Sequence, residues 1–184
     1  MMNNVQQLHM RRENLDSLPP IYLREGFGIH THFAGNEKVW EDIIERSFGS
    51  FFSFEKFLIP CGGYAPEYVL YVSKDGTDVA TAMGTEKPTF AGEGWLRMVG
   101  AVPEARGTGA GRLAVLAAMH SLAARGYKSM VLSTDDFRLP AISVYLSLGF
   151  KPIIFDSDHA DRWNAVAAQI AAYKKHKGGA SQSR

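Results

Sequence analysis

The sequence predicts a mixed α/β fold, with a predominantly antiparallel sheet and helices on both faces. Three observations support this prediction. Short apolar or alternating segments typical of strands recur along the chain, segments with helical spacing separate several of them, and a glycine-rich turn joins one strand to an alanine-rich helix. The predicted order is strand, helix, three strands, helix, strand, helix, strand and helix. Such an order packs naturally as a sheet covered by helices.

The composition is that of one ordinary globular domain. The 184 residues are 46% hydrophobic and 21% charged, and 20 Lys and Arg against 19 Asp and Glu leave a net charge of +1. A chain without excess charge is not steered as a whole to nucleic acid or to an anionic membrane, and no apolar run approaches the roughly 20 residues of a membrane helix. The single cysteine excludes an intramolecular disulfide, and the polar N-terminus lacks the apolar segment of a secretory signal. We therefore expect a soluble cytoplasmic protein with one domain over residues 1–184.

The first part of the chain is expected to begin with an arm. Residues 1–26 form this arm, because the first dozen are polar and aperiodic and Pro19-Pro20 stiffens the segment that follows. Residues 28–33 alternate between apolar and polar as a half-buried strand does. A helix with apolar residues at helical spacing follows, from the capping residue Asn36 to Gly49, which is placed to end it.

The remaining elements follow from the same signals. In chain order they are a hairpin of strands 68–73 and 77–83 around Asp75-Gly76, a strand at 95–102, a helix ended by Arg125-Gly126, a strand at 128–134, a helix from Pro140 to Gly149, a strand at 150–155 and a helix from Ser157 or Asp158. The core is thus expected over residues 27–173. Residues 174–184 are basic and contain Gly and Ser, so we expect a disordered tail.

Gly107, Gly109 and Gly111 occupy alternate positions in the turn between a strand and a helix. Without side chains, backbone N–H groups can converge on one point there, and the helix N-terminus adds partial positive charge, so the turn predicts a phosphate site. Arg106 and Arg112 would add charge-assisted hydrogen bonds. The spacing does not fit a dinucleotide-binding G-x-G-x-x-G turn, and no Lys-Ser/Thr of a P-loop follows. A plain tight turn and a site for ATP or NAD stay as weaker alternatives.

Two segments carry a resemblance to a known family. Residues 106–111, RGTGAG, resemble the R/Q-x-x-G-x-G/A signature of the GNAT N-acetyltransferase superfamily, and residues 140–150, PAISVYLSLGF, look like its A-x-x-x-Y-x-x-x-G-F segment. Residues 99–104 and 132–136 resemble the fourth and fifth strands of that family. The resemblance covers about residues 95–155. It departs from the family at Arg138, where asparagine is usual, which puts one polar contact to the coenzyme in doubt.

The resemblance implies a GNAT-like fold that binds acetyl-CoA as co-substrate, without a metal. Backbone N–H groups from Gly107 to Arg112 would hold the pyrophosphate, and the strand edge at 99–102 would pair with the pantetheine arm. Thr134 would lie near the pantetheine, the small Ala141 would let the coenzyme pass close to its helix, and Tyr145 would donate a proton to the leaving thiolate. The residues implied in coenzyme binding are Val99, Gly100, Ala101, Val102, Arg106, Gly107, Thr108, Gly109, Ala110, Gly111, Arg112, Thr134 and Ala141.

The expected function is transfer of the acetyl group of acetyl-CoA to a primary amine by direct attack. Such a reaction needs a neutral amine, a donor for the developing oxyanion and an acid for the departing sulfur, and a tyrosine with a pKa near 10 is a reasonable acid. The alternative is a catalytically idle GNAT-fold module that binds acyl-CoA as a sensor or docking domain. The amine acceptor stays open. So does the general base, for which Asp135, Asp136, Glu67 and Arg97 are only polar candidates. A spare edge strand favours a homodimer.

Other residues are better explained without a special role. His30 and His32 have the spacing of two metal ligands on a strand, but no third ligand is apparent, so we expect solvent-facing or substrate-side histidines. Cys61 is expected to be inert. The basic cluster at 174–177 is expected to be solvated rather than bound to nucleic acid. An aromatic-rich stretch is expected to be mostly core, with some members lining an acceptor pocket; it comprises Trp40, Phe51, Phe52, Phe54 and Phe57.

Overall fold

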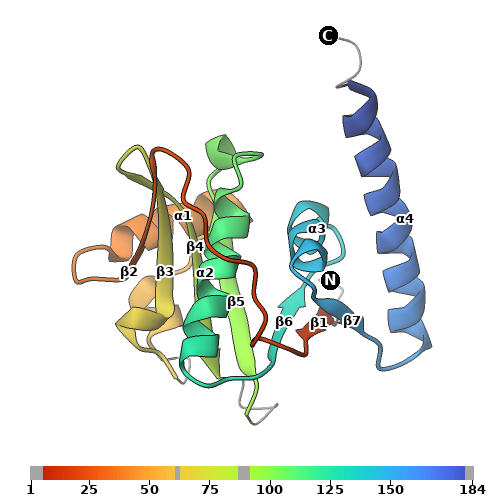
Figure 1. Cartoon of the computed structure of the whole chain (residues 1–184), viewed down its shortest axis with the longest axis horizontal. Coiled ribbons are helices and arrows are strands. Elements are labelled where there is room, and N and C mark those ends of the chain that lie inside the picture. The colour runs from red at the N-terminus through yellow and green to blue at the C-terminus, as the bar shows by residue number, and fades with distance from the viewer. Residues whose placement is uncertain (1–5, 61–62, 87–91, 181–184) are drawn as a thin grey trace. The chain divides into compact units, whose positions relative to one another are not determined.

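The described residues of the computed structural model, 6–60, 63–86 and 92–180, divide into two compact units (Figure 1). The larger unit comprises Arg12–Leu132, and the smaller one comprises the described residues before 12 and after 132. The boundary falls within strand β6 (Met130–Thr134), so this strand runs from one unit into the other. A single domain over residues 1–184 stays a prediction.

The larger unit is built on five strands. They pair in the order β2 (Phe27–Thr31), β3 (Val69–Lys74), β4 (Thr77–Glu86), β5 (Gly94–Ala101) and β6. The first three pairings are antiparallel, and only β5 with β6 is parallel. The predicted mixed and mostly antiparallel α/β architecture is therefore confirmed.

Two helices cover the sheet of the larger unit, α1 (Glu37–Phe48) on one face and α2 (Ala110–Ala124) on the other (Figure 1). Helix α1 ends as predicted at Gly49, which adopts φ 72° and donates its N–H to the carbonyl of Glu45. Helix α2 buries most of its length, including Val115, Met119 and Leu122. Short helical turns link these elements at Phe54–Leu58, Pro66–Tyr68 and Pro103–Ala105.

The smaller unit contains an antiparallel pair and two helices. Strand β1 (Leu8–Arg12) pairs with β7 (Lys151–Ile153), with His9 opposite Ile153. Helix α3 (Leu139–Ser147) begins with the predicted proline in its first turn. Helix α4 (Ser157–Ala180) buries a stripe at helical spacing, made of His159, Trp163, Val166 and Ile170.

Three segments differ from the expectation. The N-terminal arm contains β1, in which Leu8 and Met10 are fully buried; only two alternating apolar residues mark it, too few to stand out in a polar segment. The one-turn helix at Phe54–Leu58 is not predicted either. Helix α4 continues to Ala180, whereas a disordered tail is predicted from residue 174. Lys174, Lys175 and Lys177 favour the continuation of the helix, whereas Gly178 and Gly179 disfavour it.

Candidate coenzyme site

The glycine-rich turn lies in the larger unit, between β5 and α2. Gly107 and Gly109 adopt φ values of +78° and +90°, a region in which residues with a Cβ are strained. The hydroxyl of Thr108 fastens the turn, because it donates to the carbonyl of Ala105 at 2.7 Å and accepts the N–H of Ala110 at 3.3 Å. The predicted strand–turn–helix arrangement around the three glycines is therefore present.

Four N–H groups at this turn are without a hydrogen-bond acceptor among the described residues. They belong to Gly107, Gly109, Gly111 and Arg112. Gly111 and Arg112 lie in the first turn of α2, where backbone donors have no partner within the helix. The helix dipole also has its positive end there. Such a group of donors fits an anionic ligand and in particular the phosphates of a coenzyme.

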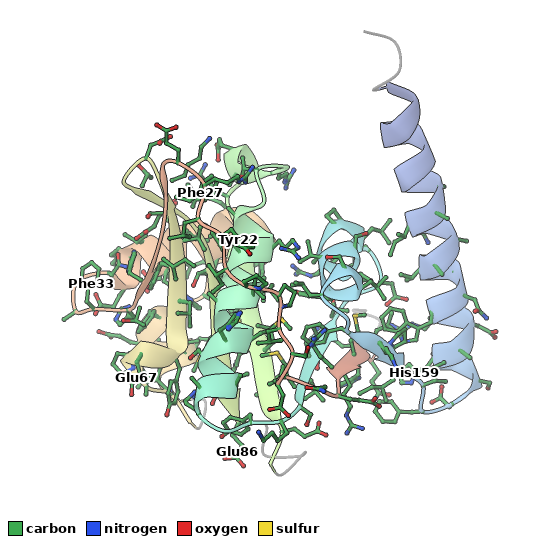
Figure 2. All side chains as sticks on the ribbon, in the orientation of Figure 1. Tyr22, Phe27, Phe33, Glu67, Glu86 and His159 are labelled. Carbon is green, nitrogen blue, oxygen red and sulfur yellow. The ribbon has the colours of Figure 1, made fainter. Side chains whose placement is uncertain are left out.

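A pocket of about 370 Å³ opens beside this turn. Its lining combines the turn and the start of α2 with the segment that precedes β2; the lining residues are Pro20, Tyr22, Arg24, Phe27, Gly107, Thr108, Gly109, Arg112, Leu113 and Leu116. Figure 2 shows Tyr22 and Phe27 on the N-terminal segment that runs beside α2. Neither Arg24 nor Arg112 forms an ion pair within the described chain, so the pocket carries uncompensated positive charge.

The edge of β5 is paired only in part. Its first three residues, Gly94 to Leu96, pair with Met130 to Leu132 of β6. In the described part of the larger unit, the β6 pairing does not extend to Met98–Ala101, of which Gly100 and Ala101 pair with β4. Met98 adopts φ +49° where the β4–β5 register shifts, so the strand is irregular at this point. The second half of β5 thus leaves an edge at which an extended ligand can add as a strand.

The residues expected to contact the pantetheine, Val99 to Val102, differ in whether their N–H groups are available for hydrogen bonding. The N–H of Ala101 is taken by the hydroxyl of Ser47 at 3.3 Å, and that of Val102 by the carbonyl of Val79 at 2.9 Å. Gly100 is buried against Ile44, whose methyl group would lie 3.0 Å from an added Cβ. Val99 is half-buried. Pairing through the N–H groups of Ala101 and Val102 is therefore not available without a rearrangement.

Thr134, Ala141 and Tyr145 belong to the smaller unit, so their placement beside the glycine turn stays a prediction. Tyr145 is buried on α3, with its ring centroid 5.9 Å from that of Phe150. Its hydroxyl makes no hydrogen bond within the described chain. Burial raises the pKa of Tyr145, and the positive charge of Arg138 partly opposes this rise. The phenol therefore keeps its proton at neutral pH.

Two of the candidate bases are already engaged as acceptors. Asp135 accepts from the guanidinium of Arg138 at 2.8 Å and from the amide of Gln7 at 3.0 Å. Asp136 accepts two hydrogen bonds from Arg162, and these hold the pKa of Asp136 below its ordinary value. The lowered pKa makes Asp136 a poor base, and the general base stays unassigned.

The histidine pair does not form a metal site. His30 lies 2.8 Å from a carboxylate oxygen of Asp78, and His32 lies 3.1 Å from the hydroxyl of Tyr71. His32 is only 7% exposed, so the expectation of a solvent-facing side chain is wrong for it; it stacks on Phe54 with 4.5 Å between ring centroids. No group of three potential ligands occurs in the described part of the chain.

The aromatic stretch is only in part core, and the lining of an acceptor pocket by some of its members stays a prediction. Trp40 and Phe54 are fully buried, whereas Phe51 is 57% and Phe57 38% exposed. Cys61 lies outside the described residues. In the described residues no helix is both long enough and apolar enough to span a bilayer.

Sequence analysis alone missed the segment that forms the outer wall of the pocket. Tyr22, Arg24 and Phe27 lie about 80 residues before the glycine turn, and only the stiff Pro19-Pro20 pair marks this segment in the sequence. An exposed tyrosine and arginine in a polar segment carry no signal of their own. Their role depends on where the chain crosses α2.

Comparison with known proteins supports the same assignment. The Acetyltransferase (GNAT) family matches residues 36–150. A mycothiol acetyltransferase from Thermomonospora curvata is 30% identical in a match 158 residues long, and the match covers 78% of this chain and 50% of that protein. A second one, from Thermobispora bispora, is 32% identical over 77% of this chain and 52% of its own. The chain thus spans about half the length of the curated relatives it matches.

A solved structure agrees with the fold. The GCN5-related N-acetyltransferase from Sphaerobacter thermophilus superposes with a TM-score of 0.66 at 26% identity, over 80% of this chain and 49% of that one. The family match covers α1, strands β3 to β6, the glycine turn and α3. On this evidence the chain belongs to the GNAT acetyltransferase family.

Proposed function

We propose that this protein transfers the acetyl group of acetyl-CoA to a primary amine by direct attack, with Tyr145 as the general acid. The observation that carries the proposal is the group of unpaired N–H donors at the turn from Gly107 to Arg112. These donors, with Arg106 and Arg112 beside them, suit the pyrophosphate of the coenzyme. Family membership supports the choice of acetyl-CoA over other phosphorylated ligands.

The coenzyme, when bound, supplies a thioester whose acetyl carbon accepts the amine. The new C–N bond replaces the C–S bond, the amine gives up a proton, and the sulfur takes one. Tyr145 carries the phenolic proton that we assign to the departing thiolate; burial raises its pKa, so this phenol is a weaker acid than a solvent-exposed tyrosine. The unpaired edge of β5 offers backbone groups to the pantetheine arm. In this reading Thr134 and the small Ala141 border that arm.

The experiment that tests the acid role is Tyr145→Phe, assayed for release of free thiol with a panel of primary amines. Turnover is expected to fall by about 10²- to 10⁴-fold, because a positioned acid contributes that much. Binding of coenzyme A, measured by calorimetry, is expected to be retained. Ser147→Ala, on the exposed end of the same helix, is the control and should keep both turnover and coenzyme A binding. Turnover unchanged in Tyr145→Phe would contradict the acid role of Tyr145, whereas coenzyme A binding without turnover of any amine by the wild type would favour the idle acyl-CoA-binding module.

A thermal-shift series tests the coenzyme assignment. Acetyl-CoA and coenzyme A at about 100 times their dissociation constant should stabilise the fold by about 2.7 kcal/mol, whereas NADH and ATP should not. No shift with either coenzyme would contradict the assignment of the glycine turn. The cytoplasmic location and the homodimer stay predictions.

A further inference from the structure

We propose that Arg24, on the segment before β2, is a phosphate ligand of the coenzyme that closes the glycine turn from outside. This inference rests on the proposed function, because it takes the turn from Gly107 to Arg112 as the pyrophosphate site. It adds a residue from a segment that lies outside the region matched by the family.

The position of the guanidinium is the first argument. A Cβ added to Gly109 would lie 3.1 Å from Nη2 of Arg24, so the guanidinium stands directly over this glycine. The N–H of Gly109 is one of the donors without an acceptor in the described chain. A phosphate oxygen bound to these donors would therefore meet the guanidinium at close range.

The absence of a competing anion is the second argument. Among described residues Arg24 pairs with no carboxylate; its guanidinium lies 5.0 Å from the ring centroid of Phe27. Arg112, which lines the same pocket, has no carboxylate partner in that part of the chain either. Two arginines that line one pocket repel each other unless an anion lies between them. The charge-assisted hydrogen bonds that arginine makes to phosphate meet this need.

The segment that carries Arg24 is held at both ends. The carbonyl of Pro19 accepts a hydrogen bond from the ring of His120 on α2 at 2.9 Å. On the other side, the carbonyl of Arg24 accepts the N–H of Phe27 at 3.0 Å, and that of Gly26 accepts the N–H of Asp75 at 2.7 Å. The backbone at Arg24 is thus fixed over the pocket before any ligand binds, which reduces the entropy lost on binding.

The test is calorimetric binding of coenzyme A, 3′-dephospho-coenzyme A and pantetheine to the full chain and to Arg24→Ala, Arg24→Lys and Lys56→Ala. Lys56 is exposed, lies outside the pocket lining and serves as the control for loss of one positive charge. Arg24→Ala is expected to lower the affinity for coenzyme A by about tenfold, which is the order of the contribution of one charge-assisted hydrogen bond. Arg24→Lys should recover part of this loss, and Lys56→Ala should change affinity little. Melting temperatures establish that each variant is folded.

The ligand series distinguishes the phosphates. An equal loss for coenzyme A and its dephospho form assigns Arg24 to the pyrophosphate and supports the proposal, whereas a loss confined to coenzyme A assigns it to the 3′-phosphate and overturns its place at the glycine turn. Unchanged affinity for coenzyme A in Arg24→Ala, or a loss equal to that in Lys56→Ala, would overturn it. If the wild type binds no coenzyme A, the proposed function fails, and the role of Arg24 fails with it.

Discussion

The buried carboxylate of Glu41 accepts a hydrogen bond from the backbone N–H of Phe54, with 2.9 Å between oxygen and nitrogen. Its other oxygen accepts from Nζ of Lys38, also at 2.9 Å. Phe54 opens the helical turn that follows α1, and the N–H groups of a first turn have no partner within the helix. Glu41 therefore ties α1 to the turn that buries Phe54 and Leu58.

Glu41→Ala should destabilise the protein by about 1–3 kcal/mol, because it leaves the buried N–H of Phe54 without an acceptor. For a chain of this length, each kcal/mol lowers the melting temperature by about 2–4 °C. Glu41→Gln keeps an oxygen that can accept the N–H of Phe54, so it should lose less stability than Glu41→Ala. Lys38→Ala is the control, because the Lys38 side chain is 87% exposed and should contribute less than about 1 kcal/mol. Equal melting temperatures for Glu41→Ala and Lys38→Ala would contradict this account.

The same contact predicts a dependence on pH. The hydrogen bond from Lys38, and then that from Phe54, hold the pKa of Glu41 below its ordinary value of 4.5. A carboxyl with a depressed folded-state pKa stabilises the fold above its unfolded-state pKa, and this contribution is lost as pH falls through the folded-state value. The difference in unfolding free energy between wild type and Glu41→Gln should thus be constant near neutral pH and shrink below about pH 4.5. Urea titrations at several pH values measure it, and a constant difference down to pH 3 would argue against the hydrogen bonds as its source.

Gly109→Ala separates backbone strain from ligand binding. The φ of +90° at this position should cost alanine about 1–2 kcal/mol of stability, and the new methyl group would press on the guanidinium of Arg24. Gly126→Ala is the matched control, because Gly126 has φ +88° and open space around its Cβ position, at the other end of α2. Both variants should have melting temperatures lowered by similar amounts, and only Gly109→Ala should weaken the binding of coenzyme A. Equal affinities in the two would place the coenzyme elsewhere.

The elements with several repeated signals could be predicted from the sequence. Helix α1 has a buried face at helical spacing and a terminal glycine, and the β3–β4 hairpin has its Asp-Gly turn, so both lie within one to three residues of the expected bounds. The glycine turn was found because its residues are adjacent in the chain. Strand β1 has only five residues, and its pairing with β7 joins segments about 140 residues apart, which no local pattern reveals.

The residues around the pocket show the same limit. Arg24 reaches the turn at Gly109 only because the chain crosses α2, and this crossing depends on contacts such as that of Pro19 with His120. Similarly, nothing in the sequence indicates that the N–H of Ala101 differs from that of Val99 in being available to a ligand. In the structure the N–H of Ala101 donates a hydrogen bond to the hydroxyl of Ser47 on α1. Residue types predict which chemistry a site can perform. Tertiary contacts decide which of its groups are free to do so.

Gly94 and Leu122 are predicted to be energetically coupled. A Cβ at Gly94 would lie 2.7 Å from Cδ1 of Leu122, which is fully buried on α2, so Gly94→Ala forces this side chain to move and should cost about 1–3 kcal/mol. Leu122→Ala alone should cost about 2–5 kcal/mol by leaving a cavity.

In the double variant the new methyl group occupies part of the space that Leu122 vacates, and the clash is gone. Its total loss should therefore be smaller than the sum of the two single losses, by about 0.5–3 kcal/mol. Leu116 supplies the control, because it is buried on the same helix and is not among the atoms nearest to a Cβ at Gly94. The stability loss of the double variant Gly94→Ala, Leu116→Ala should equal the sum of the two single losses. Urea unfolding of the wild type, the three single variants and the two double variants completes both cycles, and additivity at Gly94 and Leu122 would mean that α2 does not pack on β5 as closely as the structure indicates.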